Sequence, residues 1–215
     1  LDGVRYQGSA FMDTELRLER MDAAGIDAQL LSPNPLTFLH FIEAGDADGF
    51  CRTHNDAVAG LITRYPGRLA ATAALPAQDP ARAAAELTRA VTELGFLGGY
   101  IGTDFPHKLD DPSMDQLYET CVRLNVPLFL HPSPAGIDGP KGDPNLKDFD
   151  LDVVIGFAAQ ETLAVARLIY GGVLDRHPEL DICLSHGGGS TGYLFGRLAM
   201  AARKRPWASA ELRAD

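Results

Sequence analysis

Short apolar runs alternate with longer segments of helical periodicity along the whole chain. Brief apolar runs bounded by turn residues are typical of buried strands, and apolar positions three and four residues apart are typical of amphipathic helices. The pattern predicts strands at residues 26–32, 68–75, 96–101, 127–131 and 181–185. It predicts helices at about residues 13–24, 46–65, 79–94, 113–124, 151–175 and 190–205. Asp13 and Asp79 stand where helix N-caps are expected.

The predicted order is one helix followed by five strand–helix units. Such alternation is typical of an α/β fold with a parallel sheet and right-handed crossovers. Five units are too few for a closed eight-stranded barrel, which typically takes about 250 residues. We therefore weigh two architectures, a TIM-like (β/α)8 barrel with its first and last strands outside the chain, and a doubly wound open sheet.

Two of the predicted strands end in a histidine. The run at residues 127–131 ends in His131 and is stopped by Pro132, and the run at residues 181–185 is followed by His186 and by Gly187, Gly188 and Gly189. The carboxyl ends of parallel strands are where (β/α) barrels place their active sites, so we expect both imidazoles to point into one opening. The glycines would let the backbone turn sharply and leave open space beside His186. The alternative is that each histidine caps its strand by bonding to backbone.

Composition narrows the class of partner. The chain has 215 residues, with 19 Lys and Arg against 29 Asp and Glu, a net charge of −10. That balance disfavours nucleic acid and anionic membranes, but not a small anionic substrate bound at a local positive site. Three widely spaced cysteines, Cys51, Cys121 and Cys183, disfavour a disulfide framework and favour a reducing, cytoplasmic location. No signal peptide is visible, and no apolar run is expected to approach a membrane span.

Other polar residues are weaker candidates for a site. Arg5 and Arg197 could grip a carboxylate, although a lone arginine is more often a surface residue. Asp104, His107 and His40 fall in loops that should face the same opening, where we favour solvated loop positions over substrate contacts. Structural roles are expected for His54 and His177. Neither a phosphate-binding loop nor a Gly-x-Ser-x-Gly elbow is present in the sequence.

Longer motifs carry a family resemblance. One motif runs from Gln160-Glu161-Thr162 through residues 172–178 (GVLDRHP) to Ser185-His-Gly-Gly-Gly189 and Gly196-Arg197. Further motifs lie at residues 13–25, 109–112 and 126–132. Together they resemble the amidohydrolase-related decarboxylases. These are metal-dependent members of the amidohydrolase superfamily, and the chain is most similar to their muconate-semialdehyde branch. The resemblance covers nearly the whole chain and is not specific to one substrate.

The resemblance implies a distorted (β/α)8 barrel and assigns roles to four residues. His131 matches a metal ligand, with zinc expected first and manganese as the alternative. His186 matches the histidine that acts as base or orients an activated water. Arg5 and Arg197 match arginines that hold the substrate carboxylate, one of them supplied by a neighbouring subunit, which implies a homodimer.

The chain departs from the family at both ends. There is no His-x-His pair before Arg5 and no matching aspartate after Arg205, so the remaining metal ligands are expected outside residues 1–215. We expect residues 1–215 to form a single barrel domain that is incomplete at both ends.

These implications favour a carboxy-lyase, a metal-dependent decarboxylase of a small aromatic or muconate-like carboxylate. Specificity is expected from Phe38, His40, Asp104 and the loop at residues 132–150. A hydratase or hydrolase on the same scaffold, and a metal-free binding or scaffold protein, are the alternatives.

Overall fold

The computed structural model describes Tyr6, residues 8–133 and residues 142–208. In chain order the elements are α1 (Thr14–Ala23), β1 (Gln29–Leu31), η1 (Pro35–Thr37), α2 (Ala44–Arg64), β2 (Leu69–Ala71), β3 (Ala73–Ala74), α3 (Pro80–Thr92), β4 (Gly99–Gly102), η2 (Pro112–Met114), α4 (Asp115–Leu124), β5 (Leu128–His131), η3 (Pro144–Leu146), the π-helical η4 (Asp152–Gly156), α5 (Phe157–Tyr170), α6 (Val173–Arg176), β6 (Ile182–Leu184), η5 (Ser185–Gly188) and α7 (Thr191–Lys204).

All the strand pairs are parallel and follow the order of the chain. β1 pairs with β2, and β3, β4, β5 and β6 form a four-stranded sheet in that order. The strand expected at residues 68–75 is interrupted at Thr72, and backbone bonds from Leu97 to Ala71 (2.9 Å) and from Ala73 to Gly98 (2.8 Å) carry the pairing past the break. Strictly sequential order is that of a barrel, whereas a doubly wound sheet reverses its order at a switch point.

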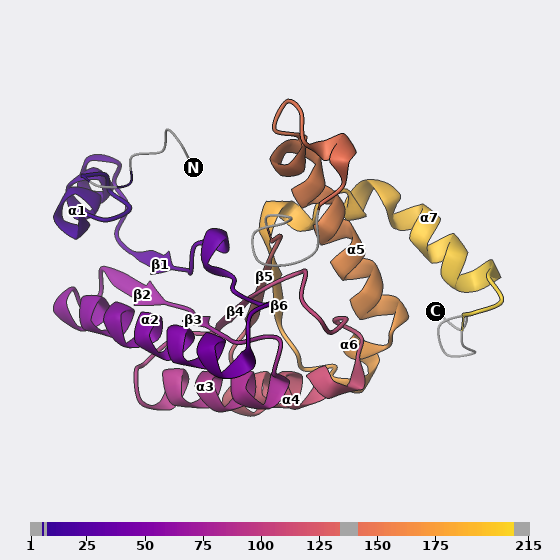
Figure 1. Cartoon of the computed structure of the whole chain (residues 1–215), viewed down its shortest axis with the longest axis horizontal. Helices are drawn as coiled ribbons and strands as arrows, with labels where there is room; N and C mark the ends of the chain where they lie inside the picture. Colours follow the sequence, from indigo (N-terminus) through magenta and orange to yellow (C-terminus); the bar gives the residue numbers. More distant parts are fainter. Residues whose placement is uncertain (1–5, 7, 134–141, 209–215) are drawn as a thin grey trace.

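The helices lie outside this row of strands. Figure 1 shows α2, α3 and α4 along one side, and α5 and α6 on the side of β5 and β6, with α7 extending beyond α5. The predicted caps are confirmed: the carboxylates of Asp13 and Asp79 accept the backbone N–H groups of Leu16 (3.0 Å) and Arg82 (3.1 Å). Each cap satisfies a donor that the first helical turn leaves unpaired.

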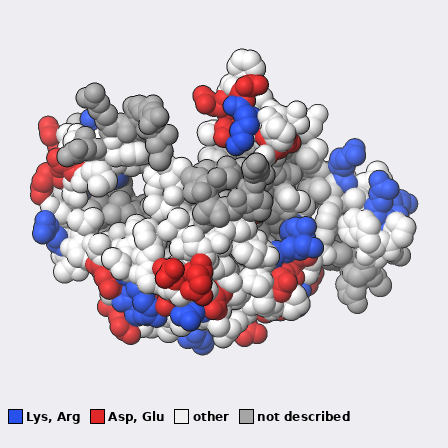
Figure 2. Space-filling model, viewed as in Figure 1, with Lys and Arg blue, Asp and Glu red and all other residues white. Residues whose placement is uncertain are grey.

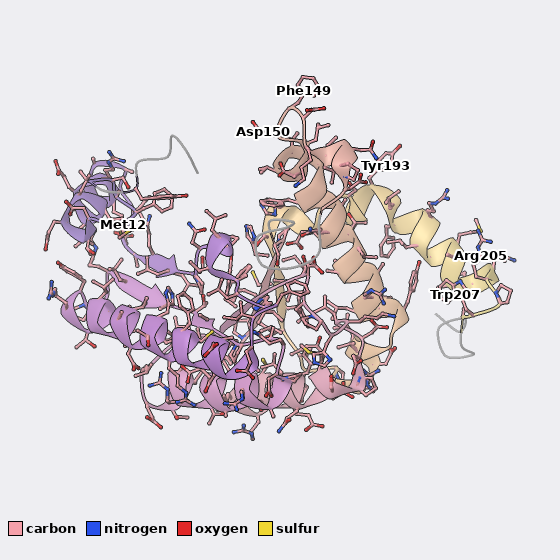
Figure 3. The ribbon with its side chains drawn as sticks, viewed as in Figure 1. Met12, Phe149, Asp150, Tyr193, Arg205 and Trp207 are labelled. Carbon is pink, nitrogen blue, oxygen red and sulfur yellow. The ribbon has the colours of Figure 1, made fainter. Side chains whose placement is uncertain are left out.

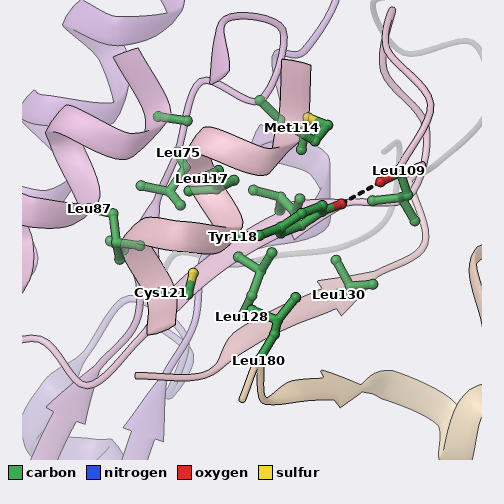
Figure 4. Packing of buried hydrophobic residues seen from close by; sticks show 14 of the residues in the cluster. Leu75, Leu87, Leu109, Met114, Leu117, Tyr118, Cys121, Leu128, Leu130 and Leu180 are labelled. Atoms are coloured by element: carbon green, nitrogen blue, oxygen red, sulfur yellow. Dashed lines mark hydrogen bonds between the residues drawn. The ribbon is translucent and has the colours of Figure 1, made fainter. Parts of the chain in front are cut away.

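The core lies between the strands and α3 and α4 (Figure 4). Tyr118 is fully buried at its centre, and its hydroxyl donates to the carbonyl oxygen of Leu109 (2.6 Å). Because a buried phenol needs a partner for its O–H, this bond lets a large aromatic ring fill the core. The leucines that pack with it are wholly buried; they are Leu87, Leu117, Leu128 and Leu130.

A buried polar link joins α2 to α3. Asn55 is fully buried, donates to the Ala74 carbonyl (3.0 Å) and to Glu86 (2.8 Å), and accepts from the Ala74 N–H (2.9 Å). Glu86, also fully buried, pairs with Arg89 (2.8 Å), which reaches the exposed Asp56 (2.7 Å). Acidic and basic side chains are interspersed along the edge of the molecule where α3 and α4 lie (Figure 2).

The helix expected over residues 151–175 is three elements rather than one. It begins as the π-helical η4, continues as α5 and breaks before α6. The break follows from Gly172, whose φ of 68° lies in the left-handed region.

The expectation that no apolar run approaches a membrane span is wrong for Asp152–Tyr170, which is long and apolar enough by length and composition. The physical reason is that α5 is apolar on its packed face, where Ala164, Val165 and Leu168 are buried, and also on the opposite face, where Leu163 is 58% exposed. Core helices can have the same length and apolarity, so this property alone does not indicate a membrane segment.

Helix α7 projects from the edge of the fold and buries none of its residues. Tyr193 near its start is 92% exposed and points outward in Figure 3. An apolar groove of about 330 Å³ separates α7 from α5 and α6, lined among others by Ile169, Leu174, Phe195 and Leu198. This groove includes neither of the strand-end histidines.

Candidate active site at the strand ends

His131 and His186 lie together, as the strand pattern predicts. Their ring centroids are 4.8 Å apart and the ring planes meet at 66°. His131 is the last residue of β5, and His186 lies one residue after Ser185, where β6 gives way to η5. The Ser185 hydroxyl donates to the carbonyl of Leu130 (2.9 Å), which ties the two strand ends together. Parallel pairing therefore brings side chains 55 positions apart in the sequence to one edge of the sheet.

The ring of His131 is oriented by the backbone. Its Nδ1 donates to the carbonyl oxygen of Pro132 (2.8 Å). Because that oxygen can only accept, the neutral ring carries its proton on Nδ1 and leaves the Nε2 lone pair free. Burial lowers the pKa of His131, the Pro132 carbonyl opposes the shift, and nearby His186 adds to it. A neutral imidazole with a free Nε2 is the form that binds a metal.

The backbone at His186 has an uncommon conformation. Its φ is 47° and its ψ is 30°, in the left-handed region that residues other than glycine rarely occupy. Gly187, Gly188 and Gly189 also have positive φ. The open space predicted beside His186 is found at Gly187, where an added Cβ would meet nothing within 4 Å. It is not found at Gly189, where a Cβ would overlap the carbonyl oxygen of Ala158. Such a conformation persists only where neighbouring contacts hold it.

Aromatic rings surround the histidine pair. The Phe157 ring centroid is 5.6 Å from both imidazoles. Tyr100 and Phe38 lie 6.2 and 6.4 Å from His131, and 5.5 Å from each other. These rings come from α5, β4 and the residue after η1, and they present flat apolar surface beside the imidazoles. Phe38 was a candidate from the sequence, whereas Tyr100 and Phe157 were not, because their apolar patterns are those of ordinary core positions.

His40 packs against these aromatic rings, so the expectation that it is a solvated loop residue is wrong. It is only 3% exposed, and its Nε2 accepts the backbone N–H of Gly102 (3.0 Å). Burial lowers the pKa of His40 to about 4, so the ring is neutral at neutral pH. It stacks on Phe38 with centroids 5.2 Å apart, and a Cβ at Gly102 would collide with Ser133. His40 thus helps to hold the Phe38 ring in place.

The other candidate histidines have structural contacts. His107 lies 3.1 Å from the carbonyl of Gln78. His177, predicted to be structural, lies 2.9 Å from a carboxylate oxygen of Asp115, and His54 stacks on Phe50 at 6.3 Å. Asp104 is exposed. The contacts of His107, His177 and His54 in the described part of the chain are therefore with residues other than the histidine pair.

Gln160 on α5 holds the loop that follows His131. Its side-chain oxygen accepts the backbone N–H of Ser133 (3.0 Å) and the hydroxyl of Thr103 (3.2 Å). The amide thus ties the ends of β4 and β5 to α5. The sequence pattern alone indicates no role for Gln160, although three consecutive polar residues in an apolar helix are a visible signal.

The next two residues of α5 face the His186 turn. Thr162 accepts the backbone N–H of Ser190 through its hydroxyl oxygen (2.8 Å). Glu161 is fully buried, and neither carboxylate oxygen has a well-formed hydrogen bond to a described residue. Burial raises the pKa of Glu161 to about 7, and the backbone N–H of Ser185 opposes the rise.

The two arginine candidates are not joined to the site by this structure. Arg5 lies outside the described residues. Arg197 is exposed on α7 and makes no hydrogen bond or ion pair with another residue in the part of the chain that the structure describes.

The described ranges also hold no cluster of three His, Cys, Asp or Glu side chains suited to a metal. His131 fits one ligand position, and further ligands would have to come from elsewhere.

Comparison with known proteins places this site in a family. The family model described as Amidohydrolase matches residues 10–211. The chain is 32% identical over 195 residues to 2-amino-3-carboxymuconate-6-semialdehyde decarboxylase of Dictyostelium discoideum, covering 90% of this chain and 53% of that protein. The chain therefore belongs to the amidohydrolase family, as the sequence motifs predict.

Solved structures give the same assignment. The 5-carboxyvanillate decarboxylase of Sphingomonas paucimobilis matches with a TM-score of 0.80 at 26% identity, over 93% of this chain and 60% of that one. A dihydroxybenzoic acid decarboxylase of Polaromonas, solved with manganese and 2-nitroresorcinol, matches with a TM-score of 0.74 at 29% identity, over 86% and 57%. The fold is thus the TIM-like barrel of this superfamily, and the chain spans little more than half the length of these proteins.

Proposed function

We propose that the protein is a metal-dependent decarboxylase of a small aromatic carboxylate. The observation that carries the proposal is the His131–His186 pair at the strand ends, whose ring centroids are 4.8 Å apart and which lies beside the Phe157 ring. The similarity to decarboxylases of aromatic acids supports this choice. Residues 1–215 would form a single barrel domain that is incomplete at both ends, and the enzyme would act in the cytoplasm.

His131 would hold a divalent metal through Nε2. The bond from its Nδ1 to Pro132 keeps that lone pair free and directed. Bound there, the metal would act as a Lewis acid that stabilises negative charge on substrate oxygens. Zinc and manganese both accept imidazole ligands, and the manganese in the Polaromonas structure supports the second.

His186 would move the proton. It delivers a proton to the ring carbon that bears the carboxylate, and the carbon–carbon electron pair returns to the ring as carbon dioxide leaves. The balance is one carboxylate and one proton in, one arene and one carbon dioxide out. Phe157 and Phe38 would hold the substrate ring flat against this proton donor, since stacked aromatic surfaces favour such an arrangement.

Arg5 and Arg197 would grip the carboxylate before it leaves. Guanidinium binds carboxylate in a two-pronged geometry. The exposed position of Arg197 on α7 suits contact with a second subunit, so the active form would be a homodimer in which one arginine comes from the neighbour.

The test uses the full-length protein, purified with and without His131→Ala. We expect about one divalent metal per chain in the unmodified protein, loss of that metal in H131A, and carbon dioxide release from dihydroxybenzoates and related acids. The matched control is His54→Gln, which removes a histidine from α2 and should keep both metal and activity. Folded protein that takes up no metal would refute the proposal. Incorporation of labelled water without carbon dioxide would indicate a hydratase or hydrolase instead.

A further inference from the structure

Two hydrogen bonds in series connect helix α5 to the ring of His131. The Gln160 side-chain oxygen accepts the backbone N–H of Ser133 (3.0 Å), and His131 Nδ1 donates to the carbonyl oxygen of Pro132 (2.8 Å). The Pro132 carbonyl and the Ser133 N–H belong to one peptide unit, which is trans. Because a trans peptide is planar, with its C=O and N–H pointing in opposite directions, a bond that holds the N–H also fixes the direction of the carbonyl.

The Gln160 amide is itself held in one orientation. A backbone N–H can only donate, so the oxygen of the amide, and not its nitrogen, faces Ser133. The same oxygen accepts the hydroxyl of Thr103 (3.2 Å). The backbone N–H of Thr103 donates to the carbonyl of His131 (3.1 Å). The Gln160 oxygen is therefore anchored to the ends of both β4 and β5, beside the residue that carries the ring.

Burial makes the bond to Ser133 important for the conformation of this peptide. Pro132 and Ser133 are both buried, and proline has no N–H, so Ser133 supplies the first backbone donor after His131. Among the described residues, Gln160 is the acceptor of that N–H. A buried backbone N–H without an acceptor is costly. Loss of the Gln160 oxygen would therefore favour rotation of the peptide, and the Pro132 carbonyl would rotate with it.

The same face of α5 also packs against the histidine rings. Phe157 lies three residues before Gln160, so the two side chains share one face of the helix. The Phe157 ring centroid is 5.6 Å from the imidazoles of both His131 and His186. One helix face thus contacts the His131 ring and also holds the peptide to which that ring is hydrogen-bonded.

We propose that Gln160 is a positioning residue that, by holding the Pro132–Ser133 peptide, keeps the His131 ring in the tautomer and orientation that leave Nε2 free. The proton of a neutral imidazole is placed by the hydrogen bond that its nitrogen makes, and here the acceptor is the Pro132 carbonyl. The proposal rests on the metal-ligand role proposed for His131. Gln160 itself touches neither the metal nor the substrate in it.

The first test reads the tautomer directly, in full-length protein whose metal has been removed with a chelator. With ¹⁵N-labelled histidine at about pH 8, where imidazole is neutral, the ring nitrogen shifts show which nitrogen carries the proton. The His131 signals are those that are absent in His131→Ala. We expect the proton on Nδ1 in the unmodified protein. Gln160→Met keeps the length of the side chain but lacks the oxygen, so a large share of its molecules should carry the proton on Nε2.

Two matched variants separate the bond to Ser133 from a general disturbance of the strand ends. Gln160→Glu keeps an acceptor oxygen at the same reach and should retain the Nδ1 tautomer. Thr103→Val removes the other donor to Gln160 and leaves the bond to Ser133 in place, so it should also retain that tautomer. A general disturbance would instead change the tautomer in all three variants.

A metal titration gives a second measurement. The outer partners of a ligating histidine typically contribute about 10–100-fold to metal affinity. We therefore expect the Kd for Mn²⁺ to rise about tenfold or more in Gln160→Met and to stay within about threefold in Gln160→Glu and Thr103→Val. Leu163→Ala, on the exposed side of α5, should leave the Kd unchanged.

The outcomes separate this proposal from the proposed function. A folded Q160M that keeps the Nδ1 tautomer and an unchanged Kd would overturn the positioning role, and so would an equal change of tautomer in T103V. A proton on Nε2 in the unmodified protein would overturn it even if Q160M does not fold. A protein that shows the expected tautomers but releases no carbon dioxide would overturn the proposed function alone, because the ring signals report position without turnover.

Discussion

Gly189 rests directly on the carbonyl oxygen of Ala158, so closely that a Cβ at Gly189 would overlap that oxygen. Gly189 also has a φ of 62°, which a residue with a Cβ rarely adopts. Two independent constraints therefore require glycine here, and both act on the loop that presents His186.

Gly189→Ala should displace this loop from α5. We expect kcat to fall at least tenfold and the free energy of unfolding to fall by about 1–3 kcal/mol, because backbone strain and a steric clash add. Steady-state kinetics and urea denaturation measure both. Gly192→Ala is the control: a Cβ there meets nothing within 4 Å and the position is helical, so its stability should stay equal or rise. Normal kcat in G189A would contradict the importance of the close contact between Gly189 and α5.

Asn55 should be among the most sensitive positions for stability. Asn55→Leu leaves the Ala74 N–H and carbonyl without their buried partner, whereas the Glu86 oxygen keeps its bond from Arg89 (2.8 Å). Each unsatisfied buried group costs about 1–3 kcal/mol, so we expect a total loss of about 3 kcal/mol or more in urea denaturation. The control is Asp56→Asn at the exposed end of the same network, where the side chain is 59% exposed. This variant should lower the free energy of unfolding by less than about 1 kcal/mol. Equal losses in the two variants would contradict the assignment.

The order of elements and the histidine pair could be predicted because both follow from local pattern. Apolar runs and helical periodicity give the strand–helix order, and parallel strands then place His131 and His186 at one edge. The interruption at Thr72 could not be predicted, since threonine is a β-branched residue that is common in strands and the residues on both sides of it are apolar. Strand boundaries depend on the backbone hydrogen bonds that neighbouring strands can form, and the apolar run does not determine these.

The supporting residues could not be predicted because their partners are remote. His40 is buried by contact with Gly102, 62 positions away, and by stacking on Phe38; its sequence context is that of an exposed loop. Gln160 and Glu161 read as a polar patch on a helix, and only the fold shows which loops they face. The roles of Arg5 and Arg197 remain predictions.

The neutral state of His40 should appear in the acid stability of the protein. Its pKa is near 6.5 when unfolded and about 4 when folded, so the unfolded chain binds the extra proton in this window. The stabilisation is complete above pH 6.5 and is lost as pH falls towards 4, by up to about 3 kcal/mol. His40→Gln keeps an acceptor for the Gly102 N–H and cannot titrate, so its thermal midpoint should fall less steeply over this range. Identical acid slopes would contradict a buried, neutral His40.

Glu161 should produce the opposite pH dependence. Burial raises its pKa to about 7 in the folded protein, against 4.5 in the unfolded chain, so the folded state holds the proton more tightly. Stability therefore decreases as pH rises from 4.5 to 7 and stays reduced above, by up to about 3 kcal/mol. Glu161→Gln cannot ionise and should escape this loss: the two proteins should differ little at pH 4.5, and the variant should be the more stable at pH 8. Thermal unfolding of both proteins at matched pH values measures the difference. A variant no more stable than the unmodified protein at pH 8 would mean that the folded protein provides the Glu161 carboxylate with compensation that the described contacts do not contain.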